Sequence, residues 1–394
     1  MKEDKIIKKL FLQLSKHKGI NTQSITKNFT DDLAYINKDN IKDLIQLTDK
    51  DFNINNTTIV VSTDSFVEGY HLIKNNNYSH YANKLFYRNL SDILCKNAKP
   101  LFYTLNIFLG SDTKIADIKQ FTKALFQLNK KFNIFTIGGD TTINKSLQSQ
   151  NITSNTNNDT YHTHQSMQNN TNQHSPFIAS ITIFGYANST TIYSRLNNTN
   201  IKDINHKNIE IYICGQIGKS YLVYLEFLHT KQHKLSIMQK SYILTNTSVK
   251  MQDNVFSNFN VIASIDISDG LINDIYKLCG ADDCVKYILN IKSIPFTKTA
   301  KKILDLCDEN SIKILNKILN RKKTEHTFEK SYQKDFELYQ YFSKKQLNKF
   351  EQKDYLNFIH NCISFGDDYN IAFLSQSSKT KNIKNISNIG YCYN

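Results

Sequence analysis

The stretch Thr58-Ile-Val-Val-Ser-Thr-Asp64 is an apolar run that ends in a carboxylate, and the segment Asn83–Asn97 follows it. Apolar β-branched residues in a short run favour a strand. The second segment repeats its apolar residues every three or four positions, as on one face of a helix. The alternation continues with strands expected at 101–108, 134–137 and 177–186 and a helix at 115–132. Strands that alternate with helices in this way predict an α/β lobe.

A second series of the same kind follows after a polar, Asn-rich stretch at 196–208. Its expected members are strands at 210–214, 261–265 and 369–374, helices at 220–229 and 271–278, and a late strand at 388–392. The 394 residues suffice for two domains. We therefore expect an N-terminal lobe over 1–197, with a disordered polar insert at 146–175, and a C-terminal lobe over 198–394, with a Lys-rich helical insert at about 301–350.

The bulk composition argues against several classes of protein. The net charge is +14, but the lysines are scattered over the chain, so a nucleic-acid partner is not expected. The sequence contains no apolar run of 18 residues, which argues against a membrane span. The seven cysteines form no CxxC pair, and the N-terminus has helical spacing instead of a secretory signal, so we expect a cytoplasmic protein with reduced thiols.

Aspartates stand where the expected strands end: Asp64, Asp140 after two glycines, Asp266, and Asp269 at the start of a helix. A single Asp at such a place is usually a helix cap or a turn residue, but strand ends are also where α/β folds bind ligands. Asp92 falls at the edge of the apolar face of its helix, where an unpaired carboxylate is costly. Clustered carboxylates suit Mg²⁺, which bridges them to phosphates.

Glycine is scarce, and most of it lies beside these aspartates. Eight of the 12 glycines fall in the candidate site segments, where they would let the backbone approach a phosphate closely. The sequence contains no GxxxxGK[ST] motif and no protein-kinase catalytic loop. A phosphotransferase with this sequence therefore belongs to another architecture.

Five segments together resemble the thiamine-monophosphate kinase family of the aminoimidazole-ribonucleotide synthetase superfamily. They are Ser62-Thr-Asp-Ser-Phe-Val-Glu-Gly-Tyr-His71, Asn89-Leu-Ser-Asp92, Ile137-Gly-Gly-Asp-Thr-Thr142, Ile265-Asp-Ile-Ser-Asp-Gly-Leu271 and Gly366-Asp-Asp-Tyr369. The resemblance covers 30–295 and 362–391 without the first insert. It implies two α/β lobes, a homodimer that pairs its N-terminal sheets, ATP as co-substrate, thiamine monophosphate as acceptor and several Mg²⁺ ions.

The resemblance also implies roles for individual residues. Those that fall on the family's magnesium positions are Asp32, Ser62, Thr63, Asp64, Asp92, Asp140, Asp266 and Asp269. Those on ATP-contacting positions are Gly139, Asp140, Arg195 and Ser268, and those on substrate positions are His71 and Asp367. Asp64, Asp92 and Asp140 would assist a direct in-line phosphoryl transfer through metal ions, with no covalent enzyme intermediate. The sequence departs from the family pattern at Thr30, Ile143, Lys219 and Asp367, and a C-terminal aromatic that would cover the thiamine is not found.

Other interpretations remain open. The chain could be a catalytically impaired dimeric homologue, or another ATP-dependent enzyme of the same superfamily. Selenophosphate synthetase would need a reactive Cys near the N-terminus, but the first cysteine here is Cys95. The hydrogenase-maturation dehydratase ends in a Cys, whereas Cys392 is followed by two more residues. A basic nucleic-acid binder would use the Lys-rich 301–350 region and show salt-sensitive binding.

Overall fold

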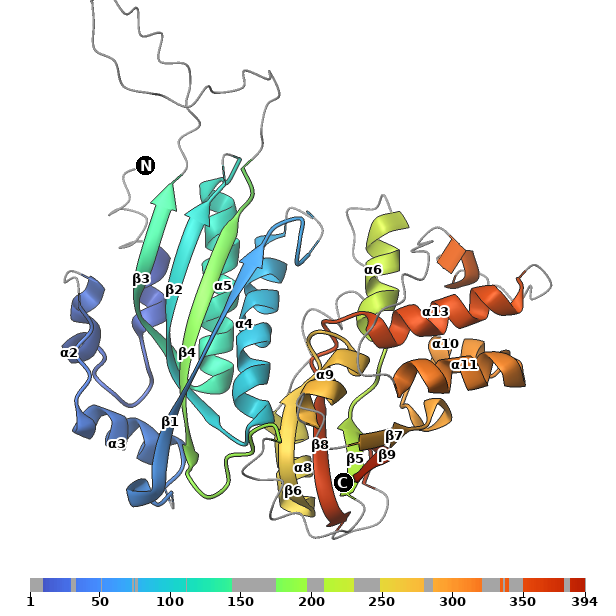
Figure 1. Cartoon of the computed structure of the whole chain (residues 1–394). Helices are drawn as coiled ribbons and strands as arrows, with labels where there is room; N and C mark the ends of the chain where they lie inside the picture. The colour runs from blue at the N-terminus through green and yellow to red at the C-terminus, as the bar shows by residue number, and fades with distance from the viewer. Residues whose placement is uncertain are drawn as a thin grey trace, which may run out of the picture.

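The computed structural model describes residues 10–29, 33–50, 52–72, 74, 77–110, 112–143, 175–196, 209–229, 249–279, 286–320, 334–335, 337–339, 350–378 and 383–393. Two β-sheets, each covered by helices, lie side by side (Figure 1). The expected fold class, two α/β lobes, is therefore confirmed. The expected boundary at residue 197 falls outside the described residues, as does the expected insert at 146–175 apart from its last residue, Ser175; both stay predictions.

The first sheet has four strands in the spatial order β1-β4-β2-β3. Their bounds are β1 (Thr57–Val67), β2 (Lys99–Leu109), β3 (Phe135–Ile143) and β4 (Ile178–Asn188). β4 is antiparallel to both β1 and β2, whereas β2 and β3 are parallel. The strand that comes last in the sequence thus lies between the first two, and β1 forms one edge of the sheet.

Two long helices, α4 (Tyr78–Cys95) and α5 (Ile115–Phe132), cover one face of this sheet (Figure 1). Their apolar sides bury a large aromatic and aliphatic core against the strands. On the opposite face, α2 (Gln23–Thr26) and α3 (Lys38–Thr48) cover only one end. The rest of that second face, here called the open face, carries Ile59 and Val61 of β1, which are 41% and 55% exposed.

The second sheet has five antiparallel strands in the order β6-β8-β5-β9-β7. Their bounds are β5 (Ile209–Cys214), β6 (Phe259–Asp266), β7 (Lys286–Leu289), β8 (Ile371–Ser378) and β9 (Ile386–Tyr393). The larger of its two cores packs helices on one face: α6 (Lys219–His229), α9 (Leu271–Leu278), α10 (Lys298–Leu304), α11 (Glu309–Leu319) and α13 (Gln352–Ser364). The helix α8 (Val249–Asn258) packs against the other face.

Helix α4 joins the two lobes. Ser264 of β6 donates a hydrogen bond to the carbonyl of Cys95 at the end of α4, with 2.5 Å between the oxygens. Next to it, the amide of Gln252 on α8 donates to the carbonyl of Ala98 at 2.8 Å. The carboxyl end of β6 therefore reaches α4, which brings Asp266 to the side chains that α4 carries.

Candidate functional site

Helix α4 places three charged side chains four residues apart: Lys84, Arg88 and Asp92. Asn77 caps the start of the helix, because its side chain accepts a hydrogen bond from the Ser79 amide at 3.2 Å. Residues four apart lie on the same side of a helix, one turn above each other. Lys84, Arg88 and Asp92 therefore form one stripe along α4. The stripe faces β1 in its own lobe, and in the second lobe it faces the loop after β6 and the loop before β8.

Strand β1 contributes Ser62 and Asp64 to this stripe but directs Thr63 to the open face. Side chains alternate between the faces of a strand. Ser62 Oγ donates to Asp92 Oδ2 at 2.5 Å, and Arg88 Nε and Nη2 donate to the two oxygens of Asp64 at 2.8 and 2.9 Å. Thr63 instead contacts the hydroxyl of Thr182 at 3.0 Å. Of the three consecutive candidate ligands, two side chains therefore lie together.

Asp266, from the second lobe, is buried near Asp92 of the first. Asp266 is 5% exposed, and Ser91 Oγ donates to its Oδ2 at 2.7 Å. Burial, and then the negative charge of Asp92, raise the pKa of Asp266. Burial also raises the pKa of Asp92, and the charge of Asp64 adds to this. The negative charges of Asp92 and Asp266 are thus not fully balanced by the protein around them. A divalent cation bound between these two carboxylates would stabilise their ionised forms.

His71 is held as a neutral hydrogen-bond donor. The backbone amide of Val67 donates to His71 Nδ1 at 2.8 Å, so the ring proton of the neutral imidazole lies on Nε2. Burial, and then the nearby charge of Arg88, lower the pKa of His71 to about 4. At neutral pH the Nε2–H group can therefore donate to an anion without the ring carrying a charge.

Asp367 lies in the loop before β8 and is held from several sides. Its backbone has φ +69°, and its amide donates to the carbonyl of Ser268 at 2.9 Å. Its carboxylate lies 3.2 Å from Lys84 Nζ and accepts from the Tyr369 hydroxyl. Burial opposes ionisation, but Lys84 and these other partners outweigh it and keep the pKa of Asp367 below its usual range. Asp367 is thus ionised and already paired.

Asp140 lies apart from this group. It follows Gly139 on β3, whose φ of +152° brings the backbone so close to β2 that a Cβ would lie 1.8 Å from the Leu105 carbonyl oxygen. The Asp140 amide donates to Asn106 Oδ1 at 3.0 Å, and both side chains are on the open face. Asp64 is on the helix-covered face, three strand spacings or about 14 Å away across the sheet. A single chain therefore does not bring Asp140 to Asp64.

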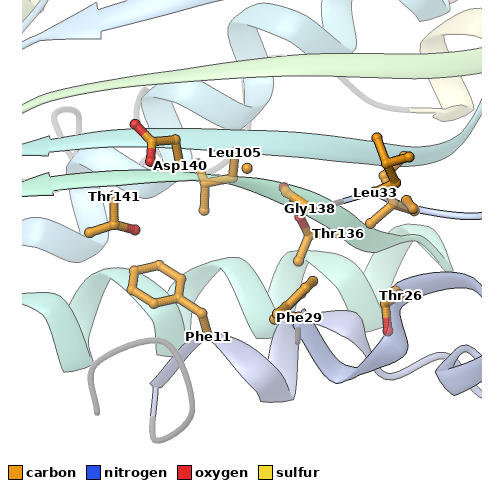
Figure 2. A pocket seen from close by; sticks show the side chains of 12 residues that line it. Phe11, Thr26, Phe29, Leu33, Leu105, Thr136, Gly138, Asp140 and Thr141 are labelled. Carbon is orange, nitrogen blue, oxygen red and sulfur yellow. Dashed lines mark hydrogen bonds between the residues drawn. The ribbon is translucent and has the colours of Figure 1, made fainter. Parts of the chain in front are cut away.

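A cavity of about 140 Å³ opens beside the same part of β3. Phe11 and Phe29 line one side of it, and the strand from Thr136 to Thr141 lines the other (Figure 2). The Asp140 carboxylate lies on the side of the strand away from Phe11 (Figure 2). The cavity thus combines aromatic walls with a glycine-rich stretch of backbone, which suits a flat ring that carries an anionic chain.

The remaining predicted residues are dispersed. Asp269 is 62% exposed and ion-paired with Lys277. Ser268 is partly buried in the loop that pairs with Asp367, and Arg195 is exposed. Asp32 and the departure at Thr30 lie outside the described residues. Within the part of the chain that is described, no three His, Cys, Asp or Glu side chains are grouped closely enough to hold one metal ion.

The expected opening of α9 by Asp269 is wrong in detail. The helix begins at Leu271, and Gly270 precedes it with φ +98°. Asp274, inside the helix, accepts from the amides of Ser268 and Asp269 at 2.9 and 2.8 Å. Asp269 therefore does not cap the helix, and its largely exposed carboxylate is paired with Lys277.

The departure at Lys219 leaves its turn intact. The buried carboxylate of Asp368 accepts from the amides of Gly218 and Ser220 at 2.8 and 3.0 Å, at the start of α6. These bonds use backbone groups and therefore do not depend on the side chain between them. Asp368 and Asp367, two neighbours in the sequence, face different elements.

Lys84 and Arg88 are the charged residues of the site that sequence analysis missed. Their signal was the spacing: Lys84, Arg88 and Asp92 recur every four residues within a helix whose other side is apolar. A lysine among apolar neighbours usually extends its charged end to solvent. Lys84 instead is 2% exposed, because Tyr369 packs over it. The sequence alone could not show this, since the two residues are far apart in the chain.

Comparisons with known proteins show which families this chain resembles. Residues 48–156 match the family described as "AIR synthase related protein, N-terminal domain". The thiamine-monophosphate kinase of Buchnera aphidicola (subsp. Schizaphis graminum) is 26% identical over 261 residues, which are 62% of this chain and 64% of that protein. The chain thus spans slightly less than two thirds of the length of this curated relative.

Solved structures share the fold. The thiamine monophosphate kinase of Aquifex aeolicus has a TM-score of 0.56 and 14% identity, with 90% of this chain and 94% of that chain covered. The structure titled "AaThiL complexed with AMPPCP and TMP" has a TM-score of 0.56 and 13% identity, with 90% of each chain covered. The hydrogenase maturation protein HypE of E. coli has a TM-score of 0.56 and 11% identity, with 100% and 92% covered.

The described residues include no helix that is both long and apolar enough to cross a membrane. The five sequence motifs, the two-lobed fold and the matched relatives agree with one another. In its five sequence motifs, its fold and its matched relatives, the chain thus resembles the thiamine-monophosphate kinases and, over residues 48–156, the N-terminal domain of AIR synthase related proteins.

Proposed function

We propose that this protein is a thiamine-monophosphate kinase, which transfers the γ-phosphoryl group of ATP to thiamine monophosphate and releases thiamine diphosphate and ADP. The observation that carries the proposal is the meeting of Asp92 and Asp266, from different lobes, beside His71 and Arg88. Such a group can bind anionic phosphates together with the cations that neutralise them. The curated relatives that carry this name support the choice of acceptor.

ATP would bind at β3. The adenine would enter the cavity between Phe11 and Phe29, and the phosphates would extend along the backbone of Gly139 and Asp140. Glycine at 139 is what allows this strand to run so close to β2. Arg195, near the end of the N-terminal lobe, and Ser268, in the loop after β6, would contact the nucleotide, as the family resemblance implies.

Magnesium ions would be held by Ser62, Asp64, Asp92 and Asp266, of which Ser62 and Asp92 are hydrogen-bonded to each other. Thr63, Asp140, Asp269 and Asp32 stay proposed ligands for further ions. When bound, the ions would supply neutralisation of the negative charge shared by the two reactants. Oxygen ligands of this kind, from carboxylates and a hydroxyl, are the ligands that Mg²⁺ prefers.

The residues of the chain would orient the acceptor for direct in-line transfer. His71 Nε2–H would donate a hydrogen bond to the phosphate of thiamine monophosphate. Asp367 would contact the substrate at its thiamine end. The acceptor's own phosphate oxygen is the nucleophile, so the protein needs no general base and forms no covalent intermediate. The contribution of the chain is positioning in a site shielded by both lobes.

A homodimer would complete the site. Strand β1 is an 11-residue edge strand, and Ile59 and Val61 are exposed on its open face. An exposed apolar edge strand is costly unless it is paired or covered. Val61→Asp should therefore shift the sedimentation coefficient from dimer to monomer, whereas Ile314→Asp on the outer helix α11 should not.

The decisive experiment is turnover by the purified protein. ATP, Mg²⁺ and thiamine monophosphate should give thiamine diphosphate, detected by chromatography, and Asp92→Asn should abolish it without lowering the melting temperature. Binding of an ATP analogue without any product would favour an impaired homologue. Product formation with another acceptor only would favour a different enzyme of the superfamily. Cytoplasmic localisation and the absence of a nucleic-acid partner stay predictions.

A further inference from the structure

Lys84 and Arg88 bring two positive charges into the centre of the site, where the family resemblance assigned none. Lys84 Nζ lies 3.2 Å from Asp367 and 4.8 Å from the centre of the Tyr369 ring. Arg88 forms two parallel hydrogen bonds with Asp64, at 2.8 and 2.9 Å. Paired geometry of this kind is stronger and more selective than a single ion pair.

The two cations differ in what a ligand can reach. Lys84 is 2% exposed and lies beneath Tyr369, so a substrate cannot contact it without moving that ring. The Arg88 side chain is 15% exposed, and its Nη1 is 3.7 Å from Asp367, which is too long for a hydrogen bond. Arg88 therefore has a nitrogen available to an incoming anion, next to His71.

Arg88 contacts both oxygens of Asp64, and the Ser65 amide also donates to Oδ1 at 2.8 Å, so a cation that binds Asp64 competes with Arg88 for this carboxylate. We propose, on the basis of the kinase function proposed above, that Arg88 is a phosphate-binding residue that exchanges partners. It holds Asp64 before substrates arrive, and it turns to the phosphate of the acceptor when a magnesium ion takes Asp64. Lys84 is a positioning residue, which keeps Asp367 in place during the exchange.

The exchange leaves no buried charge unpaired. Before it, the guanidinium of Arg88 is paired with the carboxylate of Asp64. After it, the guanidinium is paired with the acceptor phosphate and the carboxylate with the cation. The Arg88 and Asp64 side chains are partly buried, at 15% and 29% exposed, so leaving either without a partner has a cost, and each binding event offsets the cost of the other. Metal and acceptor should therefore bind cooperatively.

Arg88→Gln tests the exchange by calorimetry. Without substrate, Mn²⁺ as the probe should bind the variant about tenfold more tightly than the wild type, because its competitor at Asp64 is gone. With Mg²⁺ and a non-hydrolysable ATP analogue, thiamine monophosphate should bind at least tenfold more weakly. Arg88→Lys keeps the positive charge but cannot form two parallel hydrogen bonds. It should therefore bind thiamine monophosphate more tightly than Arg88→Gln but more weakly than the wild type.

Lys99→Gln is the matched control, since it breaks an ion pair with Asp49 (2.6 Å) at the far end of the same sheet. It should change neither affinity. A merely structural Arg88 would make both affinities weaker and lower the melting temperature, and that result would overturn the proposal. If the wild type binds no thiamine monophosphate, the proposed function fails. The metal measurement then decides alone: tighter Mn²⁺ binding by Arg88→Gln supports the exchange, and unchanged or weaker binding refutes it.

Discussion

Replacing Asp266 by Asn removes one of the two carboxylates that face each other between the lobes and keeps the shape of the side chain. Ser91 Oγ can still donate to the amide oxygen of the variant, as it does to Oδ2 at 2.7 Å in the wild type. The substitution therefore isolates the effect of the charge. We expect the variant, in the absence of metal, to be more stable than the wild type at alkaline pH.

The magnitude follows from the pKa of Asp266, which burial and Asp92 raise from 3.8 to about 7. At 1.36 kcal/mol per pKa unit, the difference corresponds to at most about 4 kcal/mol of unfolding free energy. Because the folded-state pKa is raised, this stability is present below pH 4 and is lost as the pH rises through 7. Between pH 5 and pH 8 the wild type should lose up to roughly 3 kcal/mol relative to the variant.

Urea unfolding at several pH values, with a chelator and with Mg²⁺, measures this effect. The unfolding free energy of the wild type minus that of Asp266→Asn should become more negative from pH 5 to about pH 8 and then level off. Mg²⁺ should restore the wild type mainly above pH 7, where the carboxylate is ionised, and should have little effect on the variant. Parallel pH profiles for the two proteins, or an equal effect of Mg²⁺ on both, would refute the account of a cation-binding carboxylate pair.

Three further predictions test other parts of the structure. Gly139→Ala should disrupt the pairing of β2 and β3 and abolish binding of an ATP analogue, whereas Gly138→Ala, whose Cβ would meet nothing within 4 Å, should bind nearly as the wild type does. Glu68→Gln should lower the unfolding free energy by about 1–3 kcal/mol, because the buried carboxylate accepts from the Tyr81 hydroxyl and a backbone amide; a change of melting temperature below 1 °C would contradict this. His71 should show no titration in an NMR experiment between pH 6 and pH 8, because its pKa lies near 4; a midpoint in that range would show that the ring is not held as described.

The regular elements could be predicted where the apolar pattern is strong. The helix expected at 115–132 is α5 with the same bounds, and the apolar run from Thr58 to Asp64 lies within β1, which continues to Val67. The strand expected at 134–137 continues to Ile143, because a register shift opposite β2 accommodates its two glycines. Helices α3 and α8 were not predicted, since Asn, Asp and Lys dilute their apolar pattern.

The site was predicted in part. Sequence motifs pointed to Asp64, Asp92 and Asp266, and the alternation of a strand would already have separated Thr63 from its neighbours. The distance of Asp140 could not be predicted, because it depends on β4 lying between β1 and β2, a strand order that no local pattern encodes. Whether all the motif aspartates meet stays a prediction for the assembled dimer.

The hydrogen bonds and ion pairs from α4 to the second lobe also bear on how the molecule moves. At one end of the helix, Ser264 bonds to Cys95, and near its middle Lys84 is paired with Asp367. A hinge motion between the lobes would have to break both contacts. It would also leave the buried Lys84 without its ion-pair partner, which is costly. We therefore expect substrates to enter by rearrangement of side chains and not by a domain-opening motion. The two lobes should unfold together in a single cooperative thermal transition.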